Sequence, residues 1–254
     1  MEDQSRTSAP VLNSVFPPDG RVRVNPTTVT PFSWVGQLAI TFPDGSRGTG
    51  TGTLIDRDRV LTCGHNLYQD RRGGRASSVI FSLAQNGTDR PYPPVGFRDA
   101  HVSEEYRTLS PADPATTGGV VRDYSRYLYD FGVVSLQTGL DPAEGAFPFL
   151  YDASDETLAD RTADIAGYPG DKTAGTMWNA AGPLTPPPAA EFLWYRISTF
   201  NGQSGSAVRC TFEEDEEADV PRIVGIHVAG SSELQTNFAV RLTSDVIRTI
   251  ETWL

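Results

Sequence analysis

Lysine, histidine and cysteine are scarce in this chain of 254 residues, which has 3 histidines, 2 cysteines and a single lysine, Lys172. Two cysteines are too few for a disulfide framework, and the spacing of Cys63 and Cys210 matches no zinc motif. We expect both to be unpaired thiols in the core, because free cysteine is among the most buried residue types. No run of about 18 apolar residues occurs, which excludes a membrane-spanning helix.

Positive charge is also in short supply, and the formal net charge is −11. A protein that follows nucleic-acid phosphates needs a basic face, so we expect no nucleic-acid partner and no membrane association. We also expect no cofactor, no bound metal and a monomer. The first residues, MEDQSRTSAP, lack the basic and apolar regions of a secretory signal. The protein is therefore either cytoplasmic as written or secreted with its signal already removed.

Turn-forming residues are abundant instead, with 24 Gly and 19 Pro among residues that are 38% hydrophobic. This balance is typical of a turn-rich β protein. Strand-like stretches in the first half occur at 33–42, 51–55, 59–63, 77–83 and 129–136. The polar, proline-rich residues before them indicate an extended arm, and the stretch from about Arg90 to Arg126 indicates a loop.

A second set of strand-like stretches follows at 162–168, 191–198, 205–212, 222–230 and 236–242. Two sets of about equal length indicate two barrels. The acidic run FEEDEEAD, which follows Thr211, is expected to be a solvated hairpin tip. The chain closes with a predicted helix capped by Thr243 or Ser244, whose apolar face carries Val246, Ile247, Ile250, Trp253 and Leu254.

Ser204, in the sequence NGQSGS (201–206), is the candidate nucleophile. Its small neighbours let a carbonyl group approach the hydroxyl, and the backbone N–H groups of Gly202 and Ser204 would point at the developing oxyanion. A serine between glycines is more often part of a tight turn, so this motif has little weight by itself.

His65, in LTCGH (61–65), is the candidate base. A serine nucleophile at neutral pH needs a base whose pKa lies near the working pH, and imidazole meets this need best. His101 lies in the loop-like RDAHVSEEY and is expected to be exposed, which leaves His65 and His227. The alternative for His65 is a strand-end imidazole bonded to the backbone.

Asp130 immediately precedes the apolar stretch FGVVSL, where an ionised carboxylate is costly unless buried partners receive it. By itself it fits a strand-start cap equally well. Paired with His65, a buried carboxylate would accept from the imidazole Nδ1, fix the tautomer and stabilise the imidazolium. The three candidates therefore support one another.

The segments LTCGH, YDFGVVSL and NGQSGSAV, in this order, resemble the catalytic signatures of the chymotrypsin-like serine peptidases. More narrowly, the stretches at 19–42, 50–55, 167–172, 195–208 and 223–230 resemble the bacterial glutamyl endopeptidases. The resemblance implies an all-β fold with two six-stranded antiparallel β-barrels, chymotrypsin-like, and a C-terminal helix. It also implies a serine endopeptidase that hydrolyses a polypeptide substrate through an acyl-enzyme.

The resemblance also implies a pocket for the side chain before the scissile bond. In the glutamyl endopeptidases a His and a Thr that match His227 and Thr199 line this pocket. An imidazole and a hydroxyl can donate hydrogen bonds to a carboxylate, while Gly230 leaves the pocket mouth open. We therefore expect cleavage after Glu and weaker cleavage after Asp; the alternative for His227 is a core histidine satisfied by backbone.

The expected organisation is an N-terminal arm at 1–30, a first barrel at 31–140 carrying His65 and Asp130, a second barrel at 141–242 carrying Ser204 and the pocket, and a helix at 243–254. Related glutamyl enzymes start near an equivalent of Ser14 or Val15, which indicates a short propeptide at 1–13. Gln203 stands where trypsin-type zymogens carry an activating Asp, so that switch is not expected.

Three other protein classes share some of these features. An α/β-hydrolase needs G-x-S-x-G followed by Asp and then His, but residue 206 is Ser, and the Asp residues ahead of His227 lie in the acidic run. A catalytically silent binding module with the same fold more often lacks one of the three catalytic residues, and all three are present. An active serine peptidase with another side-chain preference is the third.

Overall fold

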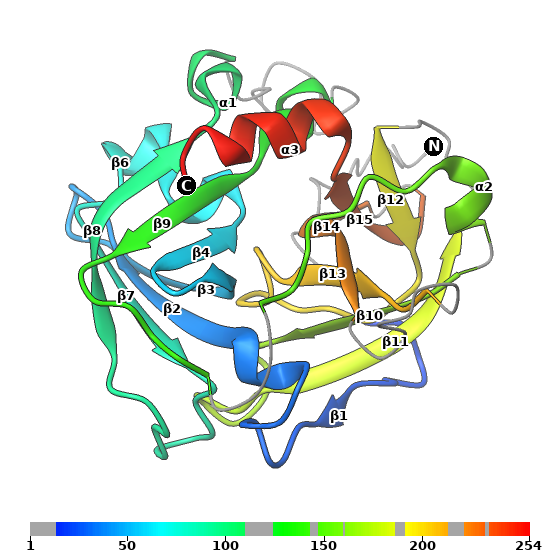
Figure 1. Ribbon diagram of the computed structural model, residues 1–254, viewed down its shortest axis with the longest axis horizontal. Coiled ribbons are helices and arrows are strands. Elements are labelled where there is room, and N and C mark those ends of the chain that lie inside the picture. The colour runs from blue at the N-terminus through cyan, green and yellow to red at the C-terminus, as the bar shows by residue number, and fades with distance from the viewer. Residues whose placement is uncertain are drawn as a thin grey trace, which may run out of the picture.

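The computed structural model describes residues 14–109, 124–142, 147–159, 161–185, 191–212, 221–231 and 234–254. Two antiparallel β-barrels lie side by side in it (Figure 1). The first is a closed six-stranded barrel in the order β2-β3-β4-β9-β8-β7. Its strands are β2 (Val35–Thr41), β3 (Arg47–Asp56), β4 (Arg59–Thr62), β7 (Ser78–Leu83), β8 (Val95–Val102) and β9 (Gly132–Leu136).

The second barrel runs in the order β11-β10-β13-β14-β15-β12 and closes where β11 pairs with β12. Its strands are β10 (Thr162–Gly167), β11 (Trp178–Thr185), β12 (Phe192–Tyr195), β13 (Ala207–Cys210), β14 (Arg222–Ser231) and β15 (Thr236–Arg241). The predicted fold of two six-stranded barrels is therefore confirmed.

Shorter elements connect and flank the barrels. The 3-10 helices are η1 (Phe32–Trp34), η2 (Gly64–Asn66), η3 (Asp70–Arg72) and η4 (Ser125–Tyr129). A small hairpin consists of β5 (Tyr68–Gln69) and β6 (Gly74–Arg75), and the α-helices are α1 (Glu104–Thr108), α2 (Asp155–Leu158) and α3 (Ser244–Glu251).

The arm ahead of the first barrel binds the second barrel. β1 (Val22–Arg23) pairs with β11, and the Ser14 backbone N–H donates to Asn237 Oδ1 at 3.0 Å. Arg21 lies between Asp19 and Asp171, with Nη2–Oδ2 distances of 2.9 and 2.5 Å. These contacts join the start of the described chain to its last third.

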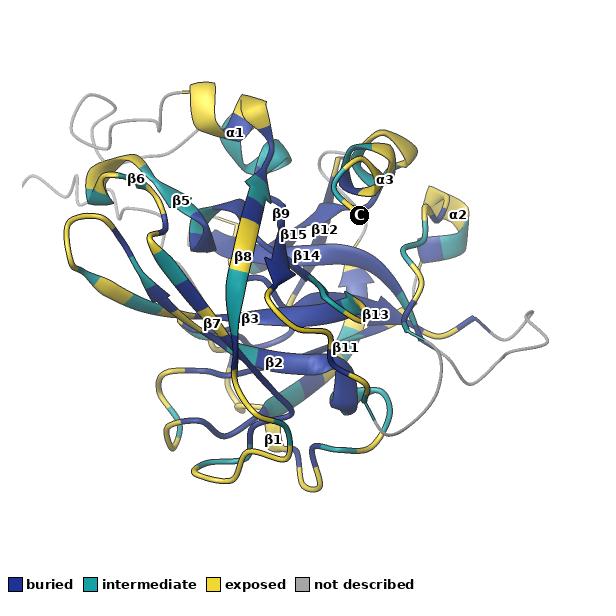
Figure 2. Ribbon diagram, turned by 60° about the vertical axis from the view of Figure 1, so that its left-hand side comes forward, coloured by how far each residue is buried: buried dark blue, intermediate teal, exposed yellow. Residues whose placement is uncertain are grey.

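Apolar side chains fill the inside of each barrel and the space between the barrels. The barrel strands are largely buried, while many of the connecting loops and helices are exposed (Figure 2). The cluster between the barrels joins Leu61 and Val133 of the first barrel to Ile226 and Phe238 of the second. Fully burying one such side chain stabilises the fold by about 1.5–3 kcal/mol. This cluster holds in place the neighbouring loops, which carry the candidate catalytic residues.

Two strands were missed in the sequence, one in each barrel. The stretch interpreted as loop contains β8, whose alternation is obscured by a register shift between Phe97 and Asp99 and by charged residues on its outer face. β11 was missed because its interior consists of Ala, Gly and Pro, which carry little strand signal. His101 therefore lies in a strand, half-buried and stacked on Trp253, and its assignment to an exposed loop was wrong.

The predicted terminal helix is present as α3, and the Thr243 hydroxyl caps it by accepting from the Val246 N–H. Ile250 is fully buried, and Trp253 reaches the first barrel, where its carbonyl accepts from Arg59 Nε at 3.2 Å. Leu254 follows the helix and is 49% exposed, so its place on the buried face was wrong.

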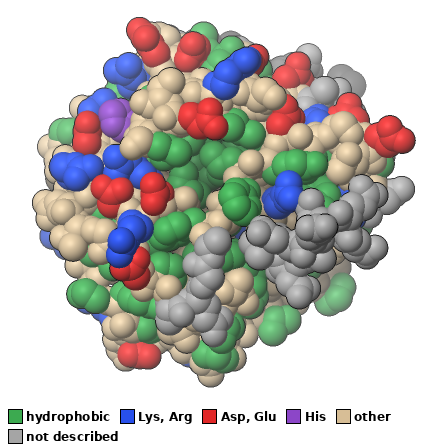
Figure 3. Space-filling model, viewed as in Figure 1, with side chains coloured by type: hydrophobic (Ala, Val, Ile, Leu, Met, Phe, Trp, Pro, Cys, Tyr) green, Lys and Arg blue, Asp and Glu red, His purple; other side chains and the backbone are tan. Residues whose placement is uncertain are grey.

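Cys63 and Cys210 are both buried and unpaired within the described residues, as expected. The acidic run at 213–219 and the expected propeptide at 1–13 lie outside those residues. On the face shown in Figure 3, Lys and Arg side chains lie among Asp and Glu side chains and form no basic patch. Of the helices described, none is long and apolar enough to cross a membrane.

Candidate active site

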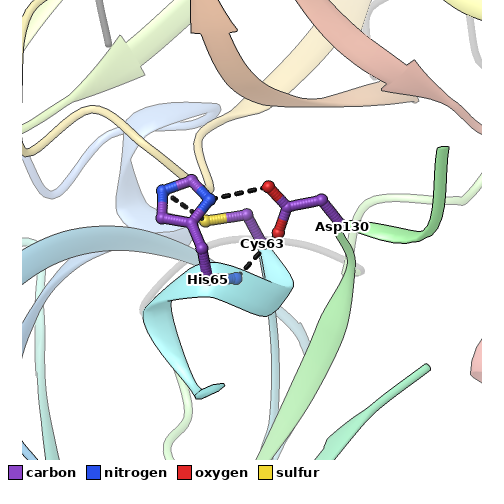
Figure 4. A group of neighbouring side chains, drawn as sticks. All are labelled: Cys63, His65 and Asp130. Atoms are coloured by element: carbon purple, nitrogen blue, oxygen red, sulfur yellow. Dashed lines mark hydrogen bonds and ion pairs between the residues drawn. The ribbon is translucent and has the colours of Figure 1, made fainter. Parts of the chain in front are cut away.

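His65 and Asp130 are brought together at one end of the first barrel. His65 sits in η2, directly after β4, and Asp130 sits directly ahead of β9, the neighbouring strand. Asp130 Oδ2 lies 2.7 Å from His65 Nδ1, and Asp130 Oδ1 accepts from the His65 backbone N–H at 2.7 Å (Figure 4). The carboxylate is fully buried while 17% of the imidazole is exposed. Both carboxylate oxygens therefore orient one histidine.

The motif LTCGH requires a small residue at position 64. A Cβ atom at this position would lie 3.1 Å from Asp130 Oδ1 and 3.2 Å from Val102 Cγ1. The absence of a side chain therefore lets the carboxylate approach the His65 backbone closely.

The protonation of His65 follows from its partner. Burial lowers the pKa of this imidazole, but the charge of Asp130, the neighbouring Cys63 and the hydrogen bond to Asp130 together raise the pKa well above the usual 6.5. Because Nδ1–H donates to Asp130, the free lone pair of the neutral ring is on Nε2. Nε2 is therefore the atom that can take a proton.

Cys63 lies against the same ring, with Sγ 3.5 Å from His65 Nε2 (Figure 4). Burial raises the pKa of the Cys63 thiol, which stays protonated at neutral pH. The ligand-type atoms of Cys63, His65 and Asp130 all lie within 4.8 Å of one another. No motif in the sequence indicated this contact.

The loop that carries Ser204 belongs to the second barrel but is held by the first. The Ser204 carbonyl accepts from the Thr51 N–H and from Asn66 Nδ2, both at 2.9 Å. The Thr51 hydroxyl also donates to the Gly202 carbonyl at 2.7 Å. Asn66 directly follows His65, so one hydrogen bond links the chain beside the imidazole to the backbone of Ser204.

No hydrogen bond joins the Ser204 hydroxyl to His65 within the described residues. Such bonds are often long or poorly aligned in enzymes without substrate and tighten when substrate binds. The structure therefore pairs His65 with Asp130 directly and ties Ser204 to this pair through Asn66.

The backbone around Ser204 leaves two N–H groups free. Gln203 N–H donates to the Phe200 carbonyl at 2.9 Å, and Gly205 N–H donates to the His227 carbonyl at 2.8 Å. In the described part of the chain, the N–H groups of Gly202 and Ser204 donate to nothing. Gly202 has a φ of +99°, and a Cβ there would lie 2.3 Å from the Tyr168 carbonyl. Glycine is therefore required for this loop conformation.

His227 lies on β14, beside the Ser204 loop, and its N–H donates to the Ser206 carbonyl at 2.9 Å. The imidazole is fully buried, with Nδ1 2.8 Å from the Tyr195 hydroxyl, while Nε2 makes no hydrogen bond among the described residues. Burial first, and then the nearby His65, lower the pKa of His227 to about 3, against a smaller opposing effect of the Phe238 backbone. This histidine is therefore neutral.

Thr199 is also fully buried, and its hydroxyl has no hydrogen-bond partner among the described residues. Its N–H donates to the Ser14 carbonyl at 3.2 Å. A Cβ on Gly230 would lie 2.5 Å from Asn237 Oδ1 and 3.2 Å from the Ser14 N. The arm therefore packs between Thr199 and Gly230. Position 230 must be glycine because a side chain there would collide with Asn237 and crowd Ser14.

Residues 50–211 match the model of the trypsin-like peptidase domain, and the chain belongs to this family of peptidases. Its sequence is 30% identical to the glutamyl endopeptidase of Bacillus licheniformis over an alignment of 256 residues, which covers 99% of the chain and 73% of the relative. A solved structure of a Glu endopeptidase in complex with MPD superimposes with a TM-score of 0.75 at 26% identity, covering 94% of the chain and 99% of the other.

A second relative, from Bacillus subtilis, bears the name extracellular metalloprotease. It is 27% identical over 242 aligned residues, which cover 95% of the chain and 70% of that protein. In the described part of this chain, the group of side chains with metal-ligating chemistry is Cys63, His65 and Asp130, which contains the paired histidine and carboxylate.

Proposed function

We propose that this protein is a serine endopeptidase that cleaves after glutamate, and more weakly after aspartate. The observation that carries the peptidase assignment is the hydrogen-bonded pair of His65 and buried Asp130 beside a loop that leaves the Gly202 and Ser204 N–H groups free. Membership of the trypsin-like peptidases supports the same conclusion.

In the proposed reaction the Ser204 hydroxyl attacks the substrate carbonyl while His65 Nε2 takes its proton. Asp130 stabilises the imidazolium, and the N–H groups of Gly202 and Ser204 donate to the oxyanion. His65 then gives the proton to the leaving amine, which departs and leaves an acyl-enzyme. Water attacks the ester with the same base, and Ser204 regains its proton as the acid product leaves.

A fluorophosphonate probe separates an active peptidase from a silent binding module. Labelling at Ser204 in the wild-type protein, lost in Ser204→Ala and much slowed in His65→Ala, is the expected result. Each substitution should lower kcat on the order of 10⁶-fold, and the double variant little more, because the residues act as a unit. A folded protein that stays unlabelled would support the binding module.

The preference for glutamate is supported by two buried groups that have no hydrogen-bond partner among the described residues, Thr199 Oγ1 and His227 Nε2. If the Tyr195 hydroxyl donates to Nδ1 of the neutral ring, then Nε2 carries the hydrogen and can donate. Leaving buried polar atoms unpaired costs about 1–3 kcal/mol each, and a substrate carboxylate would remove that cost. The pocket then binds the anion with neutral donors.

A peptide series that differs only in the residue before the scissile bond tests this preference. His227→Ala should reduce kcat/KM for the Glu peptide by about tenfold to a hundredfold, the loss expected for one hydrogen bond to a charged group, and affect Gln and Leu peptides much less. Fastest cleavage after Arg, Lys or Leu would leave the peptidase assignment standing and remove the glutamyl one.

We also propose that residues 1–13 are removed on maturation. The contacts of Ser14 with Thr199 and Asn237 support this, because Ser14 lies beside Thr199 of the proposed pocket. Intact mass and N-terminal sequencing of the active form should give Ser14 or Val15 as the first residue. An active form that keeps Met1–Asn13 would contradict the proposal.

A further inference from the structure

The thiol of Cys63 takes no part in the proposed reaction, yet it contacts the atom on which that reaction depends. Its Sγ lies 3.5 Å from His65 Nε2, and its side chain is fully buried behind the partly exposed imidazole (Figure 4). Asp130 occupies the other ring nitrogen at 2.7 Å. A sulfur therefore contacts one nitrogen of the imidazole and a carboxylate contacts the other.

The spacing fits a metal ion between the sulfur and the nitrogen. With bonds of about 2.3 Å to sulfur and about 2.0–2.1 Å to nitrogen, tetrahedral zinc holds two such ligand atoms about 3.5 Å apart. Histidines that bind metals usually donate their other N–H to a carboxylate, which fixes the ring and raises its basicity. Asp130 already has this arrangement with His65.

We propose that Cys63 Sγ and His65 Nε2 form an inhibitory site for a thiophilic divalent cation such as Zn²⁺ or Cd²⁺. Thiolate and imidazole ligands favour such ions over Mg²⁺ and Ca²⁺, which prefer oxygen. On binding, the Cys63 thiol releases its proton to solvent, and the Nε2 lone pair forms a bond to the metal. His65 then has no lone pair with which to take the proton of Ser204, and hydrolysis stops.

The inhibition rests on the proposed peptidase function, whereas the metal binding does not. The test of inhibition is a ZnCl₂ titration in a buffer free of chelators, with the uninhibited rate of each variant as its own reference. Wild-type protein should be inhibited, and EDTA should restore its activity. Cys63→Ala should need at least about tenfold more zinc for half-inhibition, because even the loss of a partner outside the ligand shell costs about tenfold to a hundredfold in metal affinity.

Cys210→Ala is the matched control, because Cys210 is also buried and unpaired but lies in the second barrel. It should respond to zinc like the wild type, and MgCl₂ should inhibit none of the three proteins. Equal zinc sensitivity of Cys63→Ala and wild type would overturn the proposal. If Cys63→Ala fails to fold, Cys63→Ser replaces it, since a hydroxyl of similar size is a poor ligand for these ions.

Cobalt supplies a readout that needs no catalysis. Co²⁺ added to wild-type protein and to Ser204→Ala should produce a thiolate-to-cobalt charge-transfer absorption, and Cys63→Ala should lack it. Absorption in a wild-type protein that shows no peptidase activity before any metal is added would contradict the proposed function and leave the metal site standing. The same absorption in Cys63→Ala, or no absorption in wild type, would contradict the metal-site proposal and leave the proposed peptidase function unaffected.

Discussion

His65 and His227 both lie near the Ser204 loop, and their hydrogen-bond partners differ in charge. His65 has the buried carboxylate of Asp130 at 2.7 Å, whereas His227 has the neutral hydroxyl of Tyr195 at 2.8 Å. The pKa of His65 is raised well above 6.5, and that of His227 is lowered to about 3.

Burial lowers the pKa of both rings, so it cannot account for the difference. The charge of the hydrogen-bond partner decides whether an imidazole is a base or a neutral donor. The proposed function uses one of each near the Ser204 loop. Four measurements test this contrast, in order of decreasing effect.

Asp130→Asn removes the charge that distinguishes His65 from His227. An amide oxygen can still accept from the His65 N–H, so the fold should persist, but the ring loses its fixed tautomer and kcat should fall about 10⁴-fold. Steady-state kinetics and circular dichroism measure both parts. Near-normal kcat in a folded variant would show that Asp130 does not set the state of His65.

Asn66→Ala breaks the hydrogen bond that ties the chain beside His65 to the Ser204 carbonyl. The loss of a buried bond costs about 1–3 kcal/mol, so kcat should fall about tenfold to a hundredfold while KM changes little. Asn66→Asp serves as the control, because it keeps the size but removes the donor. A loss confined to KM, or full activity in Asn66→Ala, would argue against a positioning role for this side chain.

Tyr195→Phe removes the hydroxyl that orients the His227 ring. One neutral hydrogen bond contributes about 0.5–1.5 kcal/mol, so kcat/KM for a Glu peptide should fall about twofold to tenfold. Tyr168→Phe, which removes a buried hydroxyl bonded to the Gln85 carbonyl, is the matched control. Equal losses for Glu and Leu peptides would indicate a general packing defect and no effect on selectivity.

The pH dependence should separate the two rings. His65 must be neutral to act as a base, so its raised pKa places the acidic limb of kcat/KM above pH 6.5. His227, with a pKa of about 3, stays neutral between pH 5.5 and 8. The ratio of Glu to Gln cleavage should therefore vary less than about twofold over that range, in which the substrate glutamate stays ionised. A ratio that titrates near pH 6.5 would show that His227 is protonated when it binds substrate.

Ten strands could be predicted from the sequence because they contain β-branched and aromatic residues in alternating apolar and polar patterns. β8 and β11 escaped because a register shift in one and small residues in the other remove that pattern. The candidates Ser204, His65 and Asp130 were found from short local motifs, and their roles remain proposals.

The partners of these residues could not be found in the same way. Tyr195 meets His227 across 32 residues, and Asn66 meets Ser204 across 138. Such contacts depend on how strands pair and barrels dock, and no local pattern records them. Cys63 is only two residues from His65 in sequence, but the turn of η2 is what places its sulfur against the ring.

The N-terminal arm has a consequence for how the chain is made. Ser14 and Arg21 are synthesised before either barrel, but their partners Asn237 and Asp171 leave the ribosome much later. In the nascent chain the arm therefore has no folded partner to bind while the first barrel forms. The first described residues to be translated are therefore among the last to reach their final positions, because they must wait until Asn237 has been synthesised.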